Sequence, residues 1–206
     1  MMSPASPEPI ILKITQIAAA AHVLARAFYN DPLMVYVMPN EEKRKRLLPV
    51  LFRIVVQYCH RYGVIYTTSG LDGLACCLPP GQSATTGRLA FVSLKNIPVQ
   101  LGLTGLRRWL HVLKYTDSAH EQAAPGAHWY LWTLGVDPER QGHGSGSQLL
   151  QMVLRQAEAQ RLPCYLDTQN PRNVPFYQRH SFRQVNETII SGSDVHVYAM
   201  LWEPPA

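Results

Sequence analysis

The sequence lacks the features of a membrane-spanning, disulfide-bonded or metal-binding protein. No apolar run reaches about 18 residues, because Lys13, His22 and Arg26 interrupt the best candidate, so we predict no membrane helix and no membrane partner. The four cysteines form no CxxC pair and the first residues show no secretory signal, which indicates reduced thiols in a cytoplasmic protein. The start of a zinc motif at His120-Glu121 has alanine at position 124 instead of the second histidine, so we predict no metal site.

Charge is sparse, and its distribution argues against nucleic acid as a partner. Only 16% of the 206 residues are charged, and the net charge is +5. The basic residues are dispersed except for one run, Lys43 to Arg46, which we interpret as a solvated helix face rather than a nucleic-acid patch. A chain of this length fits one domain, which we place at 10–206 after a disordered leader at 1–9.

The order of apolar patterns predicts a mixed α/β fold. Strand patterns occupy 10–14, 64–68 and 74–78, the last two forming a hairpin, and helical patterns occupy 17–28 and the segment that Asn40 caps. A helical pattern from 86 to 119, broken near Pro98, carries an apolar stripe of Leu103, Leu106, Leu110 and Leu113. A β-α-β unit from 129 to 168 and a hairpin at 184–202 complete a central twisted, mostly antiparallel sheet that is parallel only within the β-α-β unit.

The most informative segment is a glycine-rich loop between the strand at 129–136 and the following helix. The first N–H groups of a helix lack internal partners, and the helix dipole favours an anion there, so we expect a phosphorylated ligand at 141–147. A P-loop is excluded because no lysine follows the glycines. A dinucleotide fold would need a third glycine at position 147, which is Ser147. The remaining pattern is Gln-x-x-Gly-x-Gly, which Gln141, Gly144 and Gly146 satisfy.

This loop and the Pro-Arg-Asn-x-Pro-Phe-Tyr segment at 171–177 resemble the GNAT (GCN5-related) N-acetyltransferases, and within them the members similar to puromycin N-acetyltransferase. The resemblance is strong from 129 to 182 and looser before it. It implies the GNAT fold and an acetyl-CoA-dependent transfer of an acetyl group directly from the thioester to a primary amine of a small molecule. It also implies that the protein is a monomer or a homodimer.

The resemblance further implies the residues that hold the cofactor. The diphosphate would lie on the loop backbone, and the pantetheine arm would lie along the preceding strand. The asparagine and aromatic residues after the next strand would lie beside this arm. Val136 N–H would polarise the thioester carbonyl, and Gly135 would form a bulge that splays the strand from its neighbour. The cofactor-binding residues are Leu134, Gly135, Val136, Gln141, Gly142, His143, Gly144, Ser145, Gly146, Ser147, Asn170, Asn173, Phe176 and Tyr177.

Tyr177 corresponds to the family's general acid, which protonates the departing thiolate. The position of the strand-borne glutamate that many members use as the base is Tyr130, which is not a ready base at neutral pH. We rank Asp167 first as the base, and His120, His128 and a water relay remain open.

The acceptor amine is expected among the first two helices, the 120–130 loop and the last hairpin. The pocket residues we predict are Phe28, Tyr29, Asp31, Tyr130 and Trp132, whose rings suggest a partly aromatic or apolar amine. Alternatives are acetylation of a peptide or protein amine, a non-catalytic acyl-CoA sensor in which Tyr177 only packs, and a nucleic-acid module built on Lys43–Arg46 and Arg107–Arg108.

Overall fold

The computed structural model describes residues 9–82 and 97–205. The predicted leader and the part of the predicted helix from 86 to 96 lie outside these residues. The strands are β1 (Ile10–Ile11), β2 (Val64–Thr67), β3 (Gly73–Leu78), β4 (Trp129–Val136), β5 (Cys164–Thr168), β6 (Arg183–Ile189) and β7 (His196–Trp202). The helices are α1 (Ile17–Ala27), α2 (Pro32–Val37), α3 (Glu41–Tyr62), α5 (Ile97–Ala123), α6 (Ser145–Ala159) and α7 (Val174–Gln178). Three short 3-10 helices are η1 (Ile14–Gln16), η2 (Pro138–Arg140) and η3 (Pro171–Asn173).

All seven strands join one sheet in the order β1-β2-β3-β4-β5-β7-β6. Every neighbouring pair is antiparallel except β4 and β5, which are parallel and connected through α6. The predicted fold class, with its two hairpins and a single parallel unit, is therefore confirmed.

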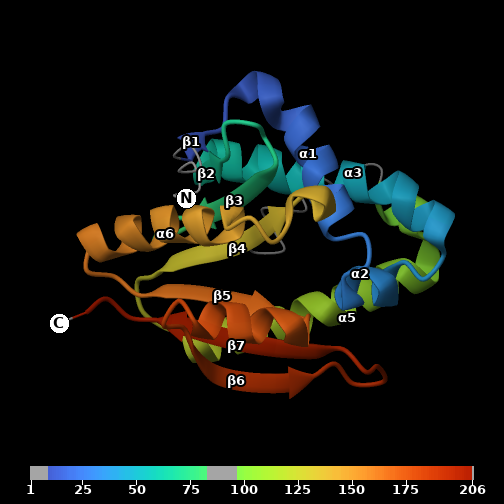
Figure 1. Ribbon diagram of the computed structural model, residues 1–206. Helices are drawn as coiled ribbons and strands as arrows, with labels where there is room; N and C mark the ends of the chain where they lie inside the picture. The colour runs from blue at the N-terminus through green and yellow to red at the C-terminus, as the bar shows by residue number, and fades with distance from the viewer. Residues whose placement is uncertain (1–8, 83–96, 206) are drawn as a thin grey trace.

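Helices cover both faces of the sheet (Figure 1). α6 and α7 lie on one face, above a core that includes Leu149, Val153 and Phe182. α1, α3 and α5 lie on the other, above a core that includes Leu24 and Tyr165. Burial on both faces explains why β3 reads as a continuous apolar run, since all six of its residues are buried.

The capping signals placed some helix ends correctly and missed one helix. Asn40 accepts a hydrogen bond from the Lys43 N–H at 2.8 Å and caps α3, as expected. α2 was not predicted because it spans only six residues, although Asp31 and Pro32 form a standard helix start. The first strand is only two residues long, and α3 continues through Pro49.

The leucine stripe on α5 is not the face that the helix buries in the core. Leu103 is 90% exposed and Leu110 is 51% exposed, whereas Leu101, Val112 and Ala119 bury the helix against the core. The phase of the helix changes at Gly102, where φ is +66°, rather than near Pro98.

The basic run on α3 is not simply a solvated face. Arg44 is 3% exposed, donates to the carbonyls of Tyr29 and Met38 at 2.8 Å, and stacks over the Tyr29 ring at 4.7 Å. Lys43 Nζ donates to the Leu101 carbonyl at 2.6 Å. These two cations fasten the segment before α3 and the break in α5, because buried carbonyl groups need donors.

We expect Gly63→Ala, at the junction of α3 and β2, to lower the free energy of unfolding by about 2–3 kcal/mol. A Cβ at Gly63 would lie 2.0 Å from the backbone oxygen of Cys77, and only a shift of β3 could relieve that overlap. Urea denaturation measures the change. Gly126→Ala is the matched control, because no atom lies within 4 Å of its Cβ position. Equal stability of the two variants would contradict the close approach of α3 and β3.

Candidate active site

The site is built where two neighbouring strands separate. β4 and β5 pair only at Trp129 with Cys164 and at Tyr130 with Tyr165, and beyond these pairs the two strands diverge (Figure 1). The predicted splay is therefore present. The register shift against β3, however, makes Trp132 the extra residue, since Cys76 pairs with Thr133 and Cys77 with Leu131. The bulge lies at Trp132 and not at Gly135.

Gly135 serves the packing of α1 instead. A Cβ there would lie 2.8 Å from Leu24 Cδ2 and 2.9 Å from Phe28 Cε2. The strand needs a residue without a side chain at this point because the helix passes so close to it.

The glycine loop after β4 is open to solvent and ends at a free helix start. Gly142 and Gly144 have φ of +81° and +84°, a backbone region that glycine enters without steric cost. Gly144 is the N-cap of α6 and provides no side-chain cap, so the first N–H groups of the helix face a potential ligand. Gly146 has no such backbone requirement, and a Cβ there would lie 3.6 Å from Phe176, an ordinary contact. The loop geometry fits a diphosphate.

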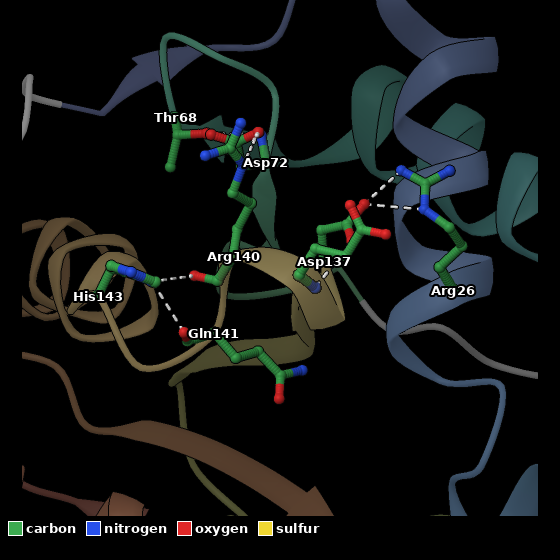
Figure 2. Close-up of polar contacts among 8 residues, drawn as sticks. Arg26, Thr68, Asp72, Asp137, Arg140, Gln141 and His143 are labelled. Atoms are coloured by element: carbon green, nitrogen blue, oxygen red, sulfur yellow. Dashed lines mark hydrogen bonds and ion pairs between the residues drawn. The ribbon is translucent and has the colours of Figure 1, made fainter.

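The base of this loop is held by ion pairs and hydrogen bonds (Figure 2). The Asp137 carboxylate pairs with the guanidinium of Arg26 from α1, with Nε at 2.8 Å. Asp137 also donates its backbone N–H to the Asp72 carbonyl at 2.7 Å, and Arg140 lies 3.9 Å from the Asp72 carboxylate. Gln141 Nε2 donates to the Val136 carbonyl at 3.0 Å. The loop is thereby tied to β4, α1 and the β2–β3 hairpin.

A cavity of about 740 Å³ opens on the other side of the splayed strands. Walls come from α1, α2, α3, α5, β4 and β5, and four carboxyl side chains line it: Asp31, Asp117, Glu121 and Asp167. Among the described residues of the wall there is no lysine or arginine. The cavity is therefore suited to a cation, although the whole chain carries a net positive charge.

Tyr177, on the short helix α7, lines this cavity and is 6% exposed. Burial, and then the charge of Asp167, raise the pKa of its hydroxyl above the usual value. The hydroxyl therefore keeps its proton at neutral pH and is available as a proton donor.

Asp167 lies across the cavity on β5, beyond the last pair with β4. Tyr130 donates its hydroxyl to Oδ1 at 3.0 Å and Gln169 donates to Oδ2 at 2.7 Å. Burial raises the pKa of this carboxyl, while the two hydrogen bonds oppose the rise. The result is a fixed carboxylate whose affinity for a proton exceeds that of an exposed aspartate.

The two histidines considered as bases form a pair. His128 Nδ1 lies 2.6 Å from the Gly126 carbonyl and donates to it, so its Nε2 accepts from His120 Nε2 at 2.7 Å. His120 stacks on Tyr165 at 4.2 Å, and burial followed by the charge of His128 lowers its pKa to about 4. Burial therefore makes the His120 imidazole a weaker proton acceptor than an exposed histidine.

Most of the predicted pocket residues line the cavity, but not all. Phe28, Asp31, Tyr130 and Trp132 lie in its wall. Tyr29 does not, because its ring packs under Arg44.

The two asparagine candidates have different surroundings. Asn173 lines the cavity and donates from Nδ2 to Thr168 Oγ1 at 3.2 Å. The Asn170 side chain instead accepts from the Arg172 N–H at 3.1 Å, as the cap of η3. Asn173 is therefore the asparagine placed to meet a ligand in the cavity.

The sequence prediction missed the cavity wall that α5 supplies. Leu106, Leu110 and Leu113 face the cavity, as do Asp117 and Glu121 near the end of the helix. The signal was present in the sequence, since the leucine stripe was recognised, but the stripe was not assigned to the acceptor pocket.

Comparison with known proteins agrees with this geometry. The family model for the acetyltransferase (GNAT) family matches residues 89–182, which include β4, the glycine loop, α6, β5 and Tyr177. An uncharacterized N-acetyltransferase of Schizosaccharomyces pombe is 27% identical over 171 residues, covering 79% of this chain and 69% of the relative.

Solved structures share the whole fold. One described as histone acetyltransferase HPA2 and related acetyltransferase, from Corynebacterium glutamicum, superposes with a TM-score of 0.69 at 22% identity, covering 98% of this chain and 97% of the other. The polyamine N-acetyltransferase of Drosophila melanogaster, which forms N-acetylagmatine, gives 0.61 at 16% identity, covering 95% and 100%. Arylalkylamine N-acetyltransferase 2 of Aedes aegypti gives 0.63 at 11% identity, covering 96% and 99%.

The fold and these matches define an acyltransferase. The chain is similar to the GNAT acetyltransferases over residues 89–182 and shares their fold, and members of that family generally use acetyl-CoA as the acyl donor. The more specific likeness to puromycin N-acetyltransferases stays a prediction.

Two neighbouring glycines of the loop should respond differently to alanine. Gly144→Ala places a side chain at φ +84° and should lower the free energy of unfolding by about 1 kcal/mol and raise the KM for acetyl-CoA. Gly146→Ala should leave the stability within about 0.5 kcal/mol, because its Cβ fits beside Phe176. Thermal unfolding and donor titrations measure both. A larger stability loss in Gly146→Ala would contradict this description of the loop.

Proposed function

We propose that the protein is an acetyl-CoA-dependent N-acetyltransferase that transfers the acetyl group directly to a primary amine of a small molecule. The observation that carries this proposal is one cavity that joins Tyr177 and Asp167 at the splayed strands and is lined by four carboxyl side chains. An amine is cationic before it reacts, and this wall attracts a cation.

The donor binds on the side of the glycine loop. The backbone of 141–147 and the start of α6 hold its diphosphate, and Leu134 and Asn173 flank the arm that reaches the cavity. The donor supplies an activated thioester. The loop residues contribute mainly through their N–H groups, since the side chain of Gln141 is committed to Val136.

Asp167 accepts the proton that the amine must lose before it attacks. Its raised pKa and its contacts with Tyr130 and Gln169 give it both proton affinity and a fixed direction. Tyr177 donates a proton to the departing thiolate. Both groups face the same cavity, so neither step requires a large rearrangement of the chain.

The acceptor is proposed to be a small molecule rather than a protein, because the amine must reach carboxyl groups inside the fold. Asp31 is 9% exposed, and burial raises its pKa to about 6. Such groups lie below the surface, where a compact amine can be enclosed.

Release of thiol from acetyl-CoA in the presence of a panel of amines tests the proposed function. We expect amine-dependent thiol release that Tyr177→Phe slows by about 10²-fold or more, as loss of a general acid does. Tyr165→Phe is the control, because that hydroxyl is buried without a hydrogen-bond partner among the described residues. Binding of coenzyme A with no thiol release for any amine would favour the non-catalytic sensor.

The pH dependence tests the assignment of Asp167. The ratio of wild-type to Asp167→Asn rates cancels the ionisation of the amine and should reach about 10²-fold or more at high pH. Below its pKa the carboxyl is protonated and cannot accept a proton, so the ratio should fall as the pH falls. Because burial raises this pKa above 3.8, the fall should occur at a higher pH than for an exposed aspartate. A ratio that does not change with pH would assign the base elsewhere.

A further inference from the structure

Helix α5 carries two apolar stripes, and only one of them packs into the core that the described residues form. Leu101, Val112 and Ala119 are at most 5% exposed and join the core. Leu106, Leu110 and Leu113 face the cavity, where Leu110 remains 51% exposed.

The second stripe is met by apolar residues of α3 across the same cavity. Leu51, Ile54 and Val55 belong to the wall on that side, and Leu51 and Ile54 are only half-buried. Apolar surface left in contact with water forgoes about 25 cal/mol per Å² that burial would provide. Folding alone does not account for this surface, because the core contacts of α5 are already made by its other stripe.

The wall changes character along α5. Its apolar part lies around Leu106 and Leu110, and its polar part, with Asp117 and His120, lies near its end, in the cavity that also contains Asp167. Eleven residues separate Leu106 from Asp117, which corresponds to about 16 Å along a helix. This separation along α5 is longer than a small amine group, so the cavity has room for another part of the acceptor molecule.

We infer that the acceptor is a primary amine carried on an apolar arm, and that this arm lies between α3 and α5 against Leu51, Ile54, Val55, Leu106, Leu110 and Leu113. The inference rests on the proposed transfer to an amine. The carboxyl end of the cavity holds the amine at Asp167 and Tyr177, and the apolar end selects among amines by the length and shape of the arm. Continuity of the two ends in one cavity of about 740 Å³ supports this occupant.

A series of linear amines from butylamine to octylamine tests the inference on the full chain. We expect kcat/KM to rise by up to about fourfold for each added methylene, which is the transfer free energy of a CH₂ group converted to a rate ratio. Leu110→Ser should flatten this rise, lowering the value for octylamine about tenfold and that for butylamine less than twofold. Leu103→Ser is the matched control, because Leu103 is on the same helix, 90% exposed, and outside the cavity wall.

The outcomes separate the inference from the proposed function. Two results would overturn the apolar subsite and leave the proposed function intact. One is acetylation of butylamine with no gain in kcat/KM along the series. The other is an equal loss of kcat/KM for all amines in Leu110→Ser. Absence of thiol release with every amine would count against the proposed function. In that case the rise in Tm with octylamine, larger in wild type than in Leu110→Ser, still supports the subsite, and equal rises overturn it.

Discussion

The separation of β4 from β5 is the constraint on which the rest of the site depends. Two parallel neighbours that pair at only two positions leave their remaining backbone groups without each other as partners. The bulge at Trp132 on the β3 side of β4 accompanies this divergence. The diverging ends carry Leu134 on β4 and Asp167 on β5, and both residues line the cavity together with Tyr177. An ideal sheet with full pairing would have no room for a thioester at this point.

The glycine loop was predictable from the sequence because its requirements are local. The backbone at Gly142 and Gly144 must enter the left-handed region, and α6 must begin directly after it, so glycines and an apolar helix pattern mark the place. The roles given to Tyr177 and Asp167 followed from the family resemblance and not from spacing. The finer error at Gly135 arose because a glycine in a strand marks either a bulge or a close approach, and only the packing of α1 decides between them.

The acceptor half was less predictable because its wall is set by tertiary contacts. The leucine pattern of α5 identified an apolar face correctly, but the position of α3 determines that this face meets a cavity. Arg44 is a second example. A run of four cations indicates a solvated helix face, and only the carbonyls of Tyr29 and Met38 turn one of them inward. Tyr29 was assigned to the pocket because it is an aromatic residue beside Phe28, whereas its ring packs under that guanidinium.

The Arg26–Asp137 ion pair has a consequence for the thermodynamics of donor binding. Together with the Asp72 contacts, it joins α1, the β2–β3 hairpin and the glycine loop while the chain folds (Figure 2). The loop is therefore already ordered in the folded protein. Binding of a diphosphate then costs less conformational entropy than ordering a free loop would. Helix α1 thus contributes to affinity for a nucleotide through a contact at the base of the loop. Loss of the contact between α1 and the loop would first slow donor binding and raise its entropic cost. The proton transfer at Tyr177 would be affected only afterwards.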